Sequence, residues 1–277
     1  MKTLPEELRK KIQSIANGKN ISILTFIAPQ DGIKTSPISF ASAAIQEKEM
    51  YRLEEMVKSL LISNKTSKKL HLIIQTPGGE LHTSYKIASF LRNKFADIEV
   101  FVPYQAASGG TLICCAANKI YIGELGNITP IDPQIRYKNT WVSAYAFERA
   151  TDTLKNLFGE HSPGEVPTPW QQMADKLDPI IYDEMSTLVF TTLIYAKTLL
   201  EKSGYDNKKA FNIALSITRP ENYSHSFVLS TDQARDIGFN IGSDDDTMRI
   251  YGELVSFRLK EKSADHSIEE FHPEETS

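Results

Sequence analysis

His-Leu-Ile-Ile-Gln-Thr-Pro-Gly-Gly occupies residues 71–79, and Gln-Ala-Ala-Ser-Gly-Gly-Thr-Leu-Ile occupies residues 105–113. In each stretch a pair of glycines follows a short apolar run that is typical of a β-strand. Each pair also precedes a run with the apolar spacing of a helix. Two successive β-α units of this kind predict neighbouring parallel strands, with both glycine turns at the same edge of the sheet.

The rest of the chain extends this pattern in both directions. Apolar spacing, caps and breakers predict helices over 5–17, 41–62, 81–94, 109–117, 142–158, 178–202, 207–217 and 232–237. Short apolar runs predict strands over 21–28, 70–75, 98–103 and 119–122. The fold class is therefore α/β: a spiral of repeated β-α units with a mostly parallel sheet and C-terminal helices. We expect a single domain over 1–260, followed by an acidic, disordered tail over 261–277.

Composition excludes several classes of protein. The 277 residues are 41% hydrophobic and carry a net charge of −4, which gives no electrostatic case for nucleic-acid binding. No apolar run approaches the roughly 20 residues of a membrane span. The N-terminus lacks the apolar core of a signal peptide. Cys114 and Cys115 are adjacent in an apolar segment and are expected to be reduced core residues. These features predict a cytoplasmic protein.

The glycine turns carry the candidate chemistry. A strand that ends in Pro77-Gly78-Gly79 can direct consecutive N–H groups at one point, as the oxyanion of acyl transfer requires. Ser108 stands at the start of a helix between two alanines and two glycines, which leaves room for a substrate. Taken separately, each turn has an ordinary explanation: a tight connector for the first and a serine N-cap for the second. Together, at one sheet edge, they suggest a nucleophile beside backbone donors.

Three segments then resemble a known family. Residues 76–79, 106–111 and 116–121 are similar to the Clp-fold serine peptidases, which include the Clp protease proteolytic subunit and the signal peptide peptidase A group. Residues 128–134 are most similar to the branch called serine dehydrogenase proteinases, and residues 224–227 together with 233–238 also fit that branch.

The resemblance implies a Clp/crotonase-like spiral fold, hydrolysis of peptide bonds in peptide or protein substrates, no metal or other cofactor, and assembly into homo-oligomers. It also makes Ser108 the nucleophile and assigns the oxyanion hole to Gly78, Gly79 and Gly109.

The general base is left open. The Clp protease branch has a histidine in the segment that corresponds to residues 129–133, and none is present here, which excludes a Clp-type triad at that position. A lysine can replace it where desolvation lowers its pKa. Lys155 lies on the first helix after the core, where related Ser-Lys enzymes carry their lysine. His225 matches a pattern of the serine dehydrogenase proteinases and needs no unusual desolvation. Both remain candidates, whereas Lys138 is more typical of a surface charge.

Two other side chains are weaker candidates for the site. Asp132 either orients a base or simply forms an Asp-Pro turn, and the turn is the more common case. His82 follows the first glycine turn and is expected to border the cleft.

Two alternative functions compete with the peptidase. A crotonase-like acyl-CoA enzyme shares the fold and the paired N–H donors, but it does not need a serine at the helix start. A catalytically inactive Clp-fold protein that binds peptides or assembles with partners would explain the missing histidine. A nicotinamide- or pyridoxal-dependent dehydratase has no motif in this sequence.

Overall fold

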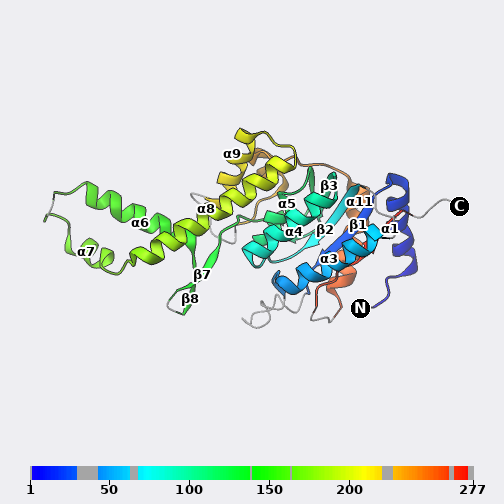
Figure 1. The fold of residues 1–277 in the computed structure, drawn as a ribbon, viewed down its shortest axis with the longest axis horizontal. Helices are drawn as coiled ribbons and strands as arrows, with labels where there is room; N and C mark the ends of the chain where they lie inside the picture. The colour runs from blue at the N-terminus through cyan, green and yellow to red at the C-terminus, as the bar shows by residue number, and fades with distance from the viewer. Residues whose placement is uncertain are drawn as a thin grey trace.

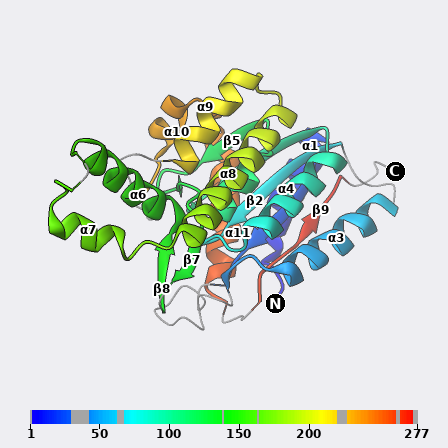
Figure 2. The ribbon, with the colours of Figure 1, turned by 60° about the vertical axis from the view of Figure 1, so that its left-hand side comes forward.

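We describe the protein from a computed structural model, which defines residues 2–29, 43–62, 68–137, 139–162, 164–219, 227–261 and 265–273. At its centre is a five-stranded sheet of order β5-β3-β2-β1-β9 (Figures 1 and 2). Four strands are parallel: β1 (Ser22–Ile27), β2 (Lys69–Gln75), β3 (Asp97–Val102) and β5 (Lys119–Ile122). The short strand β9 (Glu270–Phe271) runs antiparallel to β1. The predicted α/β class and mostly parallel sheet are confirmed.

Side chains of the sheet alternate between two apolar layers. In β1, Leu24 and Phe26 belong to one buried cluster, whereas Ile23 and Ile27 belong to another. This alternation follows from the period of two along a strand, and it gives the sheet two covered faces. The first face is covered by α3 (Glu47–Ile62), α4 (Leu81–Lys94), α5 (Gly109–Cys114), the C-terminal part of α8 (Pro179–Lys202) and α9 (Asn207–Thr218). The second is covered by α1 (Glu6–Lys19) and α11 (Asp245–Leu259) (Figures 1 and 2).

The central helix α5 is shorter than the sequence predicts. It spans Gly109–Cys114, and Ala116 and Ala117 follow it in irregular but buried chain. All six residues of α5 are buried, as its nearly continuous apolar sequence indicates. Cys114 and Cys115 are free thiols in this core.

A projecting arm follows the last parallel strand. It begins with an antiparallel hairpin of β7 (Gln134–Tyr137) and β8 (Thr140–Ser143), continues through α6 (Ala144–Gly159) and α7 (Thr168–Ala174), and returns along the first half of α8. Figure 1 shows it extending to the left, away from the sheet. The hairpin and α7 were not predicted, because their short polar and proline-containing sequences lack a clear period.

The C-terminal segment corrects one expectation. Residues 265–273 belong to the predicted disordered tail, yet they lie against β1, and His266, Ile268 and Phe271 are buried. The prediction is wrong for this segment, while 274–277 lie outside the described residues. The tail supplies strand β9, which covers the otherwise open edge of β1. The few apolar residues of this segment do not indicate a strand in the sequence. Helix α11, just before it, was also not predicted.

Candidate active site

The first glycine turn is built by close approach of two backbones. After β2, Gly78 adopts a φ of 100°, which favours glycine. The N–H of Ile45 donates to the Gly78 carbonyl at 2.8 Å, and the N–H of Glu80 donates to the Ile45 carbonyl at 2.9 Å. A Cβ on Gly79 would lie 2.2 Å from the Ile45 nitrogen. The turn therefore depends on glycine at both positions, and residue 45 fixes its orientation.

The second turn holds Ser108 in an unusual conformation. Its φ and ψ are 47° and −108°, whereas the two other described non-glycine residues with positive φ are asparagines, Asn20 and Asn139. Such backbone strain occurs preferentially at functional sites. Ser108 occupies the N-cap position of α5, yet its side chain makes no capping hydrogen bond. Capping therefore does not explain the serine.

The two turns contact one another. A Cβ on Gly78 would lie 2.9 Å from the Ser108 Cβ and 3.2 Å from the Gly109 nitrogen. A Cβ on Gly109 would lie 3.3 Å from the Gly79 nitrogen and 2.4 Å from the Ser84 hydroxyl. The structure thus brings together the four candidate residues of the two turns, which are Gly78, Gly79, Ser108 and Gly109. The three glycines have no space for a side chain.

Backbone N–H groups in these turns fall into two kinds. The N–H of Gly78 donates to the Thr76 hydroxyl at 3.1 Å, and the N–H of Ser108 donates to the Thr129 hydroxyl at 2.9 Å. Across the described part of the chain, the N–H groups of Gly79 and Gly109 donate to no hydrogen-bond acceptor. Two unpaired donors from adjacent turns, next to a serine, can stabilise a developing oxyanion.

A pair of threonines connects the serine turn to the segment after β6 (Asn127–Ile128). The Thr111 hydroxyl lies 2.8 Å from two carbonyl oxygens, those of Ala106 and Thr129, and it accepts the Thr129 N–H at 3.2 Å. Ala106, on β4 (Gln105–Ala106), pairs with Ile128 on β6. Sequence reasoning assigned no role to these threonines, although both lie in the family-like segments 106–111 and 128–134.

Of the candidate bases, the structure describes Lys155 alone. Lys155 is exposed on α6 in the arm, and no hydrogen bond or ion pair joins it to Ser108. His225 lies outside the described residues, as does Lys138. The chain on either side of residues 220–226 is nevertheless tied to the site: Ile217 accepts the Ile131 N–H at 2.7 Å, and Leu229 pairs with Ile128.

Asp132 and His82 have local partners. Asp132 is buried and accepts a hydrogen bond from the Ser143 hydroxyl at 2.6 Å, which anchors the start of α6. His82 is exposed on the first turn of α4, and its Nδ1 lies 3.1 Å from the Tyr195 hydroxyl of α8. Neither side chain is hydrogen-bonded to Ser108.

The cysteines behind Ser108 are poor nucleophiles. Burial raises the pKa of the Cys114 thiol to about 12 and raises the pKa of Cys115 well above its usual value. Because the thiolate is the reactive form, these side chains are inert at neutral pH. The two thiols therefore do not compete with Ser108 as a candidate nucleophile.

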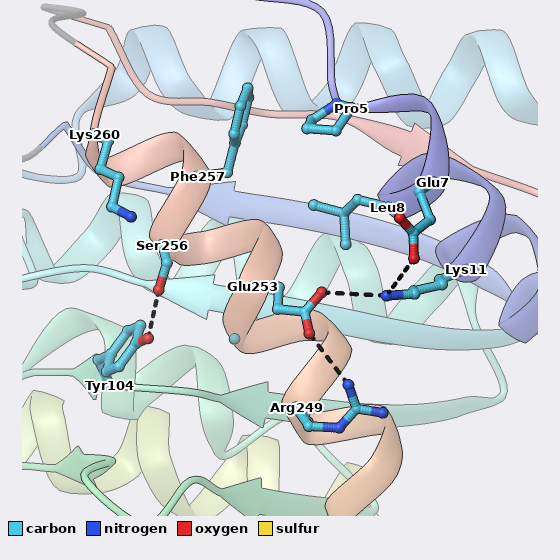
Figure 3. A pocket seen from close by; sticks show the side chains of 11 residues that line it. Pro5, Glu7, Leu8, Lys11, Tyr104, Arg249, Glu253, Ser256, Phe257 and Lys260 are labelled. Atoms are coloured by element: carbon cyan, nitrogen blue, oxygen red, sulfur yellow. Dashed lines mark hydrogen bonds and ion pairs between the residues drawn. The ribbon is translucent and has the colours of Figure 1, made fainter.

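A groove of about 640 Å³ lies elsewhere, between α1 and α11 (Figure 3). Its walls carry ion pairs from Lys11 to Glu7 and from Lys11 and Arg249 to Glu253, and the Tyr104 hydroxyl lies 2.6 Å from that of Ser256. It opens on the opposite face of the sheet from α5, so it is not part of the serine site.

Comparison with known families assigns the fold. Residues 1–153, more than half of the chain, match the family model described as ClpP-like SDH-type serine proteinase. The chain belongs to this family. The resemblance inferred from the glycine turns is therefore confirmed, and the sheet and helices described above are its Clp-like architecture.

Two curated relatives come from Methanocaldococcus jannaschii, and both are uncharacterized proteins. The first is 27% identical over 237 residues, which cover 84% of this chain and 72% of the relative. The second is 23% identical over 192 residues, which cover 69% of this chain and 57% of the relative, so the chain spans little more than half of that protein.

Two solved structures show a weaker similarity to this chain. Both are mutants of the 1510-N membrane-bound stomatin-specific protease, one of them in complex with a substrate peptide. Each is 14% identical to this chain, with TM-scores of 0.46 and 0.45. The first match covers 75% of this chain and 79% of the other, and the second covers 74% of each. At this similarity they assign no residue role or substrate to the present chain. Over the described residues, no helix is both long and apolar enough to cross a membrane.

Proposed function

We propose that the protein is a serine peptidase that hydrolyses peptide bonds through an acyl-enzyme on Ser108. The observation that carries the proposal is the conformation of this serine. It is strained, partly exposed and free of a capping bond, and it stands against two unpaired N–H groups. Membership in a family of ClpP-like serine proteinases supports the same chemistry.

The proposed reaction uses the two turns in sequence. The Ser108 hydroxyl attacks the carbonyl carbon of the scissile peptide bond while a base takes its proton. The N–H groups of Gly79 and Gly109 then donate to the oxyanion of the tetrahedral intermediate. The base returns the proton to the leaving amine, and water hydrolyses the acyl-enzyme by the same route. Gly78 contributes by allowing close contact between the turns, because its own N–H is already bound to Thr76.

Two bases are retained for this step. His225 is separated from Leu229 by at most about 14 Å of extended chain, and Leu229 pairs with the segment that contacts Ser108. Lys155 is exposed in the single chain, and a lysine needs desolvation before it can act as a base near neutral pH. We favour His225, with Lys155 as the alternative if another copy of the chain covers it.

The arm supports the proposal of a homo-oligomer. It exposes large apolar side chains, with Trp141 67%, Ile180 71% and Phe190 58% exposed. A second copy of this chain is the occupant we propose for this surface. The buried reduced thiols of Cys114 and Cys115 fit a cytoplasmic location, which belongs to the same proposal.

Labelling with a fluorophosphonate probe tests the function. Wild type should be labelled on Ser108 and should cleave a mixture of unstructured peptides, and Ser108→Ala should lose both activities. Because no capping bond is lost, Ser108→Ala should unfold at the same urea concentration as wild type. Ser230→Ala is the matched control, since Ser230 does cap its helix, α10 (Thr231–Ile237). It should retain labelling and lose about 1 kcal/mol of stability.

The alternatives give different results. A folded wild type that is neither labelled nor able to cleave peptides would contradict the peptidase and favour the inactive, peptide-binding protein. Hydrolysis or isomerisation of an acyl-CoA that persists in Ser108→Ala would favour the crotonase-like enzyme. His225→Ala and Lys155→Ala, measured side by side, identify the base by the larger loss of labelling rate.

A further inference from the structure

The two glycine turns share a hydrogen-bonding pattern that neither turn reveals separately. In the first, the Thr76 hydroxyl accepts the N–H of Gly78, and the next N–H, that of Gly79, is unpaired among the described residues. In the second, the Thr129 hydroxyl accepts the N–H of Ser108, and the next N–H, that of Gly109, is likewise unpaired. In each turn, therefore, a threonine hydroxyl accepts a hydrogen bond from the N–H group that immediately precedes the unpaired N–H group.

We propose that Thr76 and Thr129 are positioning residues that select the N–H groups of Gly79 and Gly109 as the oxyanion donors. This inference rests on the proposed peptidase function. Successive N–H groups in a turn point in different directions, so holding one of them fixes the orientation of the next peptide plane. The hydroxyls hold the preceding N–H groups away from the substrate.

Both threonines are suited to this task by burial and packing. Thr76 is fully buried and Thr129 is 4% exposed, so water does not compete for their hydroxyls. A Cβ on Gly110 would lie 2.5 Å from the Thr76 methyl carbon, so Thr76 also packs against the helix that carries Ser108. The two threonines come from different segments, and each holds one of the two contacting turns.

The Thr129 contact also bears on the strain at Ser108. A residue with positive φ and a β-carbon costs of order 1–3 kcal/mol, and surrounding contacts must hold it in place. Thr129 binds the Ser108 N–H, while Thr111 binds the Thr129 backbone and the Ala106 carbonyl. Loss of the Thr129 hydroxyl leaves the Ser108 N–H unpaired and lets this peptide plane rotate.

The test compares valine and serine at each position. Valine keeps the branched shape and removes the hydroxyl, whereas serine keeps the hydroxyl. Thr129→Val and Thr76→Val should each slow fluorophosphonate labelling of Ser108 by roughly 10- to 100-fold. Thr129→Ser and Thr76→Ser should restore the rate to within about threefold of wild type, a rescue that a role in packing alone would not produce.

Thr25→Val is the matched control. Thr25 is buried in β1, and its hydroxyl accepts the Glu269 N–H at 2.8 Å, which is the same kind of bond at the far edge of the sheet. This variant should lose a few degrees of melting temperature and keep the wild-type labelling rate per folded molecule.

Three results would overturn the inference. The first is a valine variant that labels as fast as wild type. The second is a serine variant that is as slow as its valine counterpart. The third is a loss of rate in Thr25→Val that matches the loss in Thr129→Val, which would show a general effect of stability. If these occur while wild type is labelled on Ser108, the peptidase proposal stands and the positioning role fails. Absence of labelling in the wild type overturns both.

Discussion

The α/β core and the projecting arm bury their apolar residues to very different extents. The core has two extensive clusters, one on each face of the sheet, and it holds both glycine turns in mutual contact. The cluster within the arm contains only three fully buried residues among those described: Ala144, Met185 and Val189. A single chain therefore holds the proposed nucleophile, Ser108, against the proposed oxyanion donors, whereas the arm lacks much of the burial that would stabilise it alone.

This difference in burial shows which candidate site residues are held in place within one chain. Ser108 and its neighbours are constrained by backbone contacts and by buried threonines. Lys155 stands on a helix whose outer face meets solvent. A role for Lys155 as the base would therefore depend on assembly, whereas the contact between the two glycine turns forms within one chain.

The largest expected effect is at Gly79. Gly79→Ala places a Cβ 2.2 Å from the Ile45 nitrogen, which forces two backbones apart. It should lower the free energy of unfolding in urea by about 3 kcal/mol or more and abolish labelling. In the arm, Gly159→Ala meets nothing within 4 Å at the end of α6 and should raise stability by about 0.5–1 kcal/mol. Equal losses at both glycines would contradict the contrast between the two regions.

The second largest effect is expected on the self-association of the arm. Ile180→Ser combined with Phe190→Ser removes two exposed apolar side chains from the arm, and it should weaken association of copies about tenfold or more. Light scattering across a dilution series measures this change. Leu125→Ser is the control, because Leu125 is 80% exposed on a loop of the core, and it should leave association unchanged. A double variant that associates like wild type would remove the arm as the interface.

The junction between the regions gives a smaller effect. The Ser143 hydroxyl accepts the Ala146 N–H at the start of α6 and donates to Asp132. Ser143→Ala should cost about 1 kcal/mol, chiefly within the arm. Hydrogen exchange should show faster exchange in α6 and unchanged protection in α4. Faster exchange in both helices would mean that the arm and the core unfold as one cooperative unit.

The smallest effect concerns a carboxylate at the other end of the sheet. A hydrogen bond from His71 is the main cause that lowers the pKa of Glu99 below the usual value of a glutamate, although burial opposes it. A lowered folded-state pKa stabilises the fold above the unfolded pKa, and this stabilisation is lost as the pH falls through the folded value. Wild type should therefore lose more stability than Glu99→Gln between neutral pH and about pH 3. Parallel curves for the two proteins in acid urea titrations would contradict this assignment.

Much of the fold could be read from local patterns. The period of two in the strands and the glycine pairs after them predict β2, α4 and β3 close to their observed bounds, and they predict the start of α5. Prediction failed where order depends on distant partners. The segment 265–273 has few apolar residues, and it is ordered by pairing with β1 far away in the chain. The hairpin of β7 and β8 likewise carries little periodic signal.

The site divides along the same line. The residue types at Gly78, Gly79, Ser108 and Gly109 predict the two contacting turns of the candidate site, because glycine is needed where backbones approach closely. No local pattern indicates that Ile45 braces the first turn or that Thr129 holds the second, since each bond joins segments separated by many residues.

The sequence by itself determined the α/β class, the parallel direction of the central strands and the candidate serine with its glycines. These follow from periodicity and from steric limits that act within a few residues. Tertiary structure alone decided which N–H groups are unpaired, that Ser108 does not cap its helix, and that Lys155 lies on an exposed arm. Those properties depend on which distant groups lie within hydrogen-bonding distance, and a one-dimensional pattern of residue types does not contain that information.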